Sequence, residues 1–424
     1  MRDDSERVRA SDRAFVRYWW ASAVSAGGTA ITAVALPVLV VQTLDASPMD
    51  VGIVNAAQVL PYALLGLVAG VWVDRWRRKP LLIAASIGRA VVLALIPVLW
   101  ALGALHLWVL LALLFAFGAL SVFGFAAAQS LLPRIVPRAR LLTANARLDQ
   151  ADAAAQTAGP ALGGGLVAAV GAPIAMAVDA LSFVVEAVLI ARVRVEERRG
   201  PRTPARLSAQ VREGLSWTYR HPALAPLAVS THVWFVANAA GMTVLALVAL
   251  RQAGLSPFAF GLIVAAGAVA TLAGAVLAPH LGARWGAGGT IIAARAVYPV
   301  AWGIVAVVAM TDAVSSPPLA SSLLGAGLVL HGFAGGVENA NEMGYRQAVT
   351  PDALLGRMNA TLRSVNRTMA AAGALAGGAV VAMAGTAPAL IGVVALCAVA
   401  CVLAVLSPAL RAARHEPALD ETPG

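Results

Sequence analysis

Four acidic residues stand inside stretches of sequence that are otherwise apolar. Asp179 and Glu186 lie seven residues apart in one stretch, and Glu338 and Glu342 lie four apart in another. Both spacings put the two carboxylates on one face of a helix. A charge at the centre of a membrane-spanning helix costs about 2.5–3.5 kcal/mol, whereas a leucine returns only about 0.3–0.6 kcal/mol. Because a desolvated carboxylate can take up and release protons near neutral pH, these four residues are candidates for proton coupling.

A structural role is the alternative for the same acids. Ion pairs with arginine would brace neighbouring helices without any proton transfer. The depth of Asp179 and Glu338 favours proton coupling, whereas both roles stay open for Glu342 and Asp149, which lie closer to basic loops. The arginines available as partners are Arg89, Arg147, Arg295, Arg363 and Arg367.

A few polar and aromatic residues in the apolar stretches are candidates for a substrate cavity, since such a cavity needs sparse polar contacts in apolar walls. His331, seven residues before Glu338, lies on the same helix face and could relay protons. Ordinary packing inside a helix bundle is the alternative for all of them. The cavity candidates are Asn55, Gln58, Trp234 and Asn238.

The amino-acid composition indicates that membrane-spanning helices must position these residues. The 424-residue chain is 60% hydrophobic and only 12% charged, with a mean hydropathy of +0.79. A soluble chain would carry about 25% charged residues, so the apolar excess must face lipid. About 20 apolar helical residues cross a bilayer. This length predicts twelve spans, at residues 17–42, 51–73, 80–101, 107–131, 143–169, 172–192, 224–249, 257–281, 290–311, 320–345, 359–384 and 387–408.

The basic residues predict the topology of these spans. The formal net charge is +10, and arginines recur in short bursts between alternate spans, while the opposite turns hold only Arg251. By the positive-inside rule, both termini are cytoplasmic, and the protein is expected in the cytoplasmic (inner) membrane as a multi-pass protein. The basic balance therefore indicates the lipid bilayer and not nucleic acid as its partner. The first apolar stretch is too long for a cleaved signal peptide and is expected to remain as a span.

A duplication divides the chain. Pro137, Asn145 and Gly159 recur as Pro351, Asn359 and Gly373 at a constant offset of 214 residues. The predicted domains are a six-helix bundle at residues 1–193, a cytoplasmic linker at 194–222, a second six-helix bundle at 223–410 and a cytoplasmic tail at 411–424. Secondary transporters use such duplicated halves to form a site at the midplane of the membrane.

The loop after the second span carries a recognisable motif. Residues 70–79 read Gly-Val-Trp-Val-Asp-Arg-Trp-Arg-Arg-Lys, with Arg77 where the family pattern prefers glycine. This segment resembles the loop signature of the major facilitator superfamily, and the resemblance covers nearly the whole chain. It implies an all-α fold of twelve transmembrane helices in two six-helix bundles. It also implies a gating motif made of Gly70, Asp74, Arg75, Arg78 and Lys79.

The fifth predicted span carries a second motif of the superfamily. Gly159, Pro160, Gly163 and Gly164 resemble the Gly-Pro-x-x-Gly-Gly pattern of its proton-linked exporters. Proline bends a helix, and glycines let helices approach closely, so the segment is a candidate antiporter hinge. Plain packing of small residues is the alternative. The resemblance extends to bacterial drug and siderophore exporters and implies efflux.

Enzyme chemistry finds little support in the sequence. The only lysine, Lys79, precedes a proline, so no ATP-binding P-loop is present. No zinc-type or magnesium-type motif occurs either, and we expect no catalytic residue, no metal and no cofactor. Cys397 and Cys401 are expected to be packing residues.

The sequence therefore predicts a transporter that exports a small amphipathic or hydrophobic molecule, such as a drug, antibiotic or siderophore-like metabolite, in exchange for protons. A monomer is expected. Alternatives with the same fold are an uptake symporter and a lysolipid translocator, and a non-transporting receptor or scaffold is an alternative of another class.

Overall fold

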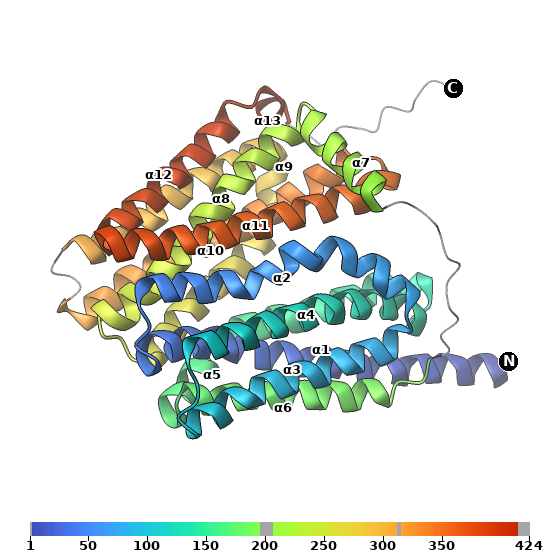
Figure 1. Cartoon of the computed structure of the whole chain (residues 1–424). Coiled ribbons are helices and arrows are strands. Elements are labelled where there is room, and N and C mark those ends of the chain that lie inside the picture. Colours follow the sequence, from blue (N-terminus) through green and yellow to red (C-terminus); the bar gives the residue numbers. More distant parts are fainter. Residues whose placement is uncertain (1, 196–206, 312–314, 414–424) are drawn as a thin grey trace. The chain divides into compact units, whose positions relative to one another are not determined.

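The computed structural model describes residues 2–195, 207–311 and 315–413, and these residues form helices and no strand. Figure 1 labels the helices in chain order. The N-terminal half contains a long first helix that ends in a π-helical segment, and five further long helices. They are α1 (Arg2–Val38) with η1 (Leu39–Thr43), α2 (Pro48–Arg75), α3 (Arg78–Ala101), α4 (Leu107–Ile135), η2 (Arg138–Arg140), α5 (Leu141–Val170) and α6 (Ala172–Ala191).

The C-terminal half begins with a short amphipathic helix and then repeats this pattern, including a π-helical segment after its first long helix. Its elements are α7 (Leu207–Arg220), α8 (Leu224–Ala246), η3 (Leu247–Gln252), α9 (Pro257–Met310), α10 (Pro317–Ala348), α11 (Asp352–Ala384), α12 (Thr386–Val405) and α13 (Pro408–Ala412). The all-helical fold predicted from the sequence is confirmed.

Helix α9 joins two predicted spans. Its 54 residues would extend about 80 Å as a straight helix, far more than a bilayer core of about 30 Å. The helix breaks at Gly286, where φ is 76°, a backbone conformation that favours glycine. Ten described helices are long and apolar enough to cross a membrane when α9 is taken as one. Helix α5, which carries Asp149 and Asp152, is not among these ten, so its span and the total of twelve stay predictions.

By its internal contacts the chain forms two compact units. Unit 1 comprises Met1–Leu44 and Leu60–Pro204, and unit 2 comprises Asp45–Val59 and Ala205–Gly424. The first part of α2 therefore belongs with the C-terminal helices, although the duplication assigns all of α2 to the first bundle. One buried core of unit 1 surrounds Tyr18 and Leu131, and one of unit 2 surrounds Ile291 and Leu410.

Matching glycines pack matching helix pairs in the two units. A Cβ atom added to Gly163 of α5 would lie 2.9 Å from Ile31 Cα of α1, which no real structure tolerates without a shift. Its counterpart Gly377 of α11 stands in the same relation to Ala240 of α8, with the same 2.9 Å. These glycines allow the helix backbones to approach closely.

The helix connections repeat as well. Gly171 separates α5 from α6 with φ 83°, and Gly385 separates α11 from α12 with φ 90°. The two glycines are 214 residues apart, which is the offset of the sequence repeat. The duplication therefore extends from sequence to backbone conformation.

Candidate functional site

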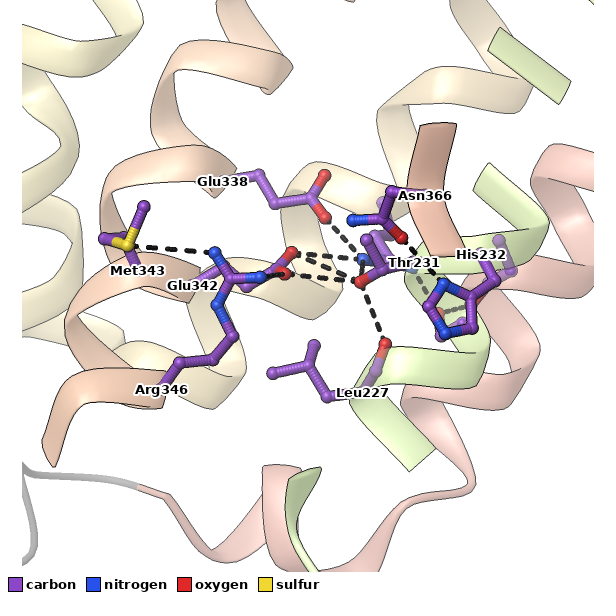
Figure 2. Close-up of polar contacts among 11 residues, drawn as sticks. Leu227, Thr231, His232, Glu338, Glu342, Met343, Arg346 and Asn366 are labelled. Carbon is purple, nitrogen blue, oxygen red and sulfur yellow. Dashed lines mark hydrogen bonds and ion pairs between the residues drawn. The ribbon is translucent and has the colours of Figure 1, made fainter. Parts of the chain in front are cut away.

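The predicted acids of unit 2 meet at one arginine. Arg295 of α9 has no solvent-exposed surface, and its Nη2 lies 2.7 Å from Glu338 Oε1 and 3.3 Å from Glu342 Oε2. Figure 2 shows both carboxylates of α10 directed toward the same point beside Thr231. The four-residue spacing of the two acids puts them on one face of α10, as the sequence predicts.

Hydroxyl groups and a second arginine complete this cluster. Thr231 Oγ1 of α8 accepts a hydrogen bond of 2.7 Å from Arg295 Nη2, and Arg295 Nη1 donates to Ser230 Oγ. Arg346, one helical turn beyond Glu342, lies 3.1 Å from Glu342 Oε1. Two arginines and two glutamates balance in charge, which is the condition for burying ionised groups at tolerable cost.

One oxygen of this cluster has no partner among the residues that the structure describes. Within these residues, Glu338 Oε2 is buried without a hydrogen bond, and the same is true of Trp234 Nε1 and His331 Nδ1. All three residues line a cavity of about 370 Å³. Buried polar atoms without partners are rare in native structures and indicate a ligand, an ion or water that would satisfy them.

Aromatic rings form much of the cavity wall. The rings of Trp234 and His331 are nearly parallel, with an interplanar angle of 8° and centroids 6.2 Å apart. Tyr298 of α9 has its ring centroid 5.5 Å from that of Trp234 and 5.1 Å from that of His331. Phe235, which also lines the cavity, packs edge-on against Trp234. Such a site combines apolar walls with few polar groups, as small-molecule sites do.

A polar chain links the cavity to the amphipathic helix α7. Tyr219 Oη donates to His232 Nε2 over 2.6 Å, and His232 Nδ1 donates to Asn366 Oδ1 over 2.7 Å. Asn366 lines the cavity, while Tyr219 belongs to α7, outside the predicted spans. Burial raises the pKa of Tyr219, so its hydroxyl keeps the proton that it donates.

The acids of unit 1 have separate partners. Glu186 Oε2 accepts from Arg89 Nη2 and from Ser86 Oγ, each at 2.9 Å. Asp179, which is fully buried, accepts from Thr32 Oγ1 at 2.6 Å and from Ser182 Oγ at 3.0 Å. Glu186 is thus held in an ion pair, whereas the direct partners described for Asp179 are hydroxyls.

The remaining candidates lie apart from these clusters. Asn55 Nδ2 donates to Thr243 Oγ1 over 3.0 Å, and Gln58 Nε2 donates to Asn55 Oδ1 over 3.3 Å, so this polar pair lies against α8. The structure brings Trp234 to the cavity, but it does not bring the pair there. The Oδ1 atom of Asn238 is buried without a hydrogen bond.

The predicted gating motif is described only in part. The side chains of Gly70, Asp74 and Arg75 lie outside the described residues. Arg78 is buried, and Lys79 Nζ donates to the carbonyl oxygens of Ala191 and Val193, each at 2.8 Å. Lys79 thus caps the carboxyl end of α6, where its positive charge also interacts favourably with the negative end of the helix dipole.

The predicted antiporter hinge forms a contact between helices. Gly159 of α5 packs against Ala30 and Gly163 against Ile31, and Pro160 and Gly164 are buried beside them. The structure thus shows the close approach that small residues permit; a hinge motion stays a prediction.

Sequence reasoning missed the groups that orient these acids. Thr231, His232, Arg346 and Asn366 were not among the candidates, although each contacts the cluster or its cavity. The spacing of Arg346, four residues after Glu342, was a usable signal, because residues four apart on a helix contact each other.

A known protein family matches this chain over nearly its whole length. The model of the transmembrane secretion effector family matches residues 9–422, nearly the whole chain. The chain belongs to this family of major facilitator transporters. It is therefore a multi-pass protein of the bacterial inner membrane and a member of a transporter family, not an enzyme family.

Curated relatives match over part of their length. The multidrug efflux pump Tap of Mycobacterium tuberculosis is 32% identical over 211 residues, 47% of this chain and 49% of Tap. The MFS-type transporter YfiS of Bacillus subtilis is 28% identical over 185 residues, 43% of each chain. The chain thus spans about half the length of the curated relatives it matches.

Solved structures share the fold. A point mutant of the nucleoside transporter NupG superposes with a TM-score of 0.75 at 11% identity, covering 94% of this chain and 99% of NupG. A bacterial homologue of the human lysosomal transporter Spinster gives a TM-score of 0.69 at 15% identity, covering 97% and 99%. At such low identity these likenesses show the fold alone.

Proposed function

We propose that this transporter exports a small amphipathic or hydrophobic compound from the cytoplasm in exchange for protons. The observation that carries the proposal concerns Glu338, which lines the cavity. One of its oxygens is paired with Arg295, and the other has no hydrogen-bond partner in the described part of the chain. A proton taken up by Glu338 removes one negative charge from a balanced cluster. Glu342 is then the remaining ionised partner of Arg295, and Glu342 also pairs with Arg346.

Such a change acts on three helices at once. The cluster joins α8, α9 and α10, so protonation alters the contacts between them, and a conformation that suits the new charges gains population. Asp179 is the corresponding candidate in unit 1, because hydroxyls and not a direct ion pair hold it. Glu186 and Glu342 are the second pair of candidates, with their arginines as counter-charges.

The direction of transport has separate support. The Gly159 to Gly164 segment resembles the motif of proton-linked exporters, and one curated relative is named a multidrug efflux pump. We therefore expect the compound to leave the cell as protons enter. With both termini inside, this means uptake into inverted membrane vesicles whose interior is acidic.

Inverted vesicles test the proposal with the uncharged dyes Nile red and N-phenyl-1-naphthylamine as probes. Vesicles with an acidic interior should accumulate at least one dye, and a protonophore should stop accumulation. Glu338→Gln and Asp179→Asn should abolish uphill accumulation but leave downhill exchange measurable. Glu213→Gln is the matched control, because Glu213 pairs with Arg357 at the partly exposed surface of α7 and α11.

Four outcomes would overturn the proposal. Accumulation that ignores the protonophore excludes proton coupling, and dye loss from acidic vesicles indicates an uptake symporter. Movement of lysolipid but of no dye indicates a lysolipid translocator. A protein that moves no dye and no lysolipid in either direction fits the receptor or scaffold.

A further inference from the structure

The cavity of unit 2 has several features besides the Glu338 carboxylate that indicate what it binds. It has a volume of about 370 Å³, within the range of small-molecule sites, and its lining comes from α8, α9, α10 and α11. Four of its lining residues hold buried polar atoms that have no hydrogen-bond partner among the described residues: Trp234, His331, Glu338 and Arg346. Each such atom lacks a hydrogen bond, which a bound molecule can supply.

The chemistry of these atoms limits what can bind. Trp234 Nε1 and Arg346 Nε each carry a hydrogen and can only donate, so each requires an acceptor. The free oxygen of ionised Glu338 can only accept, so it requires a donor such as a hydroxyl or an N–H group. His331 Nδ1 takes either role according to its tautomer. A ligand that carries both a donor and an acceptor satisfies the cavity.

The charge balance limits the ligand further. Arg295 and Arg346 are engaged with Glu338 and Glu342, so the ionised cluster is neutral as a whole. A cation or an anion entering the cavity would need an additional counter-charge, and burying it without one is costly. An uncharged molecule meets no such cost.

The walls favour a flat ring system. The rings of Trp234, Phe235, Tyr298 and His331 lie beside the cavity, and contacts between aromatic rings are more favourable than the burial of their area alone. We propose that this cavity binds an uncharged planar aromatic compound that gives a hydrogen-bond donor to Glu338 and an acceptor to Trp234. This assignment rests on the proposed function, since it names the substrate class of the same site.

The assignment also explains how proton and substrate would exclude each other. Glu338 Oε1 is paired with Arg295, so we expect an incoming proton to bind the unpartnered Oε2, the oxygen that the proposal assigns to the ligand's donor. Protonated Oε2 no longer accepts from the ligand's donor. The proton and the donor group therefore compete for one atom, and either can displace the other. The charged or titratable groups around this carboxylate are Arg295 and Tyr298 of α9, His331, Glu342 and Arg346 of α10, His232 of α8 and Cys397 of α12.

A matched pair of flavones tests the assignment by binding alone. 6-Hydroxyflavone and 6-methoxyflavone share their rings and carbonyl acceptor and are uncharged at pH 6.5, but only the first has a donor. Equilibrium dialysis against the protein in nanodiscs, corrected with empty nanodiscs, should give about tenfold tighter binding of the hydroxy compound. The preference should shrink as the pH falls, because protons occupy Glu338 Oε2.

Two variants sharpen the experiment. In Glu338→Gln the amide oxygen must face Arg295, which only donates, so the amide NH2 faces the cavity and the preference should reverse toward the methoxy compound. Trp234→Phe should weaken both compounds about tenfold and keep their ratio, because both carry the carbonyl. Glu213→Gln, which removes the partly exposed ion pair with Arg357, is the control and should change neither affinity.

The results separate the substrate class from the transport proposal. A hydroxy-to-methoxy ratio near one in the unchanged protein, or an unaltered ratio in Glu338→Gln, overturns the assignment even if dye export is coupled to protons. Should Glu338→Gln fail to elute as a folded species, Trp234→Phe decides: unaltered binding of both flavones overturns the assignment, and equal weakening supports it. Because no gradient is present, failed transport does not affect this measurement.

Discussion

Replacement of Arg295 by methionine tests the cluster most directly. Arg295 has no solvent exposure and is the common partner of Glu338 at 2.7 Å and Glu342 at 3.3 Å. Removing one partner of a buried ion pair costs about 3–5 kcal/mol, because a buried charge is left without compensation. A second route gives a similar value, since protonating a glutamate with a pKa of about 4.3 at pH 7 costs about 4 kcal/mol. We therefore expect Arg295→Met to lower stability by about 3–5 kcal/mol at pH 7.

A compensating change should restore most of this loss. In Arg295→Met/Glu338→Gln only Glu342 remains charged, and Arg346 at 3.1 Å still pairs with it. The double variant should regain at least about 2 kcal/mol. On the scale of a domain of 150–250 residues, the single variant should lose about 6–20 °C in its melting temperature. Melting of the detergent-solubilised protein, followed by the monodisperse fraction after heating, measures both.

The pH adds an independent signature. In Arg295→Met an unpaired carboxylate is neutralised by protonation, so the folded state binds more protons than the unfolded state, and stability rises as the pH falls. The double variant lacks Glu338 and should respond less. The reasoning is refuted if Arg295→Met melts like the unchanged protein at pH 8, or if Glu338→Gln fails to rescue it.

Three further results are expected. Gly163→Ala should lower stability by about 1–3 kcal/mol through overpacking against α1, whereas Gly27→Ala, with no atom within 4 Å of the added Cβ, should not; equal melting temperatures would contradict this. Lys79→Met should cost about 1–2 kcal/mol by uncapping α6, and an unshifted melting curve would speak against the capping role. His221 Nδ1 accepts hydrogen bonds from two backbone N–H groups at the start of α8, and burial lowers the pKa of His221. The contribution of His221 to stability is therefore complete above about pH 6.5 and is lost as the pH falls. His221→Ala should abolish that part of the pH dependence of the melting temperature.

The fold could be predicted from the sequence wherever a feature depends on the residue pattern of one helix alone. Apolar length predicted the helices, and the glycines at 159, 163 and 164 indicated a close approach between helices, although only the structure identifies α1 as the partner of Gly159 and Gly163. The face shared by Glu338 and Glu342 followed from their spacing alone. These features depend on periodicity, which is a property of a single segment.

Partners were harder to predict, because a helix does not encode which neighbour it meets. Five arginines were open as counter-charges. The structure pairs Arg89 with Glu186, and Arg295 with Glu342, which lies 47 residues after it in the chain. His232 and Asn366 are 134 residues apart and share no motif, so nothing in the sequence joined them. Residues 45–59 belong to unit 2 by their contacts, although their place in the chain assigned them to the first half.

The hydrogen bond from Asn55 to Thr243 has a consequence for how the protein is made. Its two residues are 188 positions apart, and ribosomes add about 5–20 residues per second. Asn55 therefore waits about 10–40 s for its acceptor after it has been synthesised. During this time its amide must find another partner in the membrane, in the translocon or in water, because an unsatisfied amide in hydrocarbon is costly. The lipid-exposed lifetime of the first part of α2 is thus set by the speed of translation and not by the stability of the finished fold.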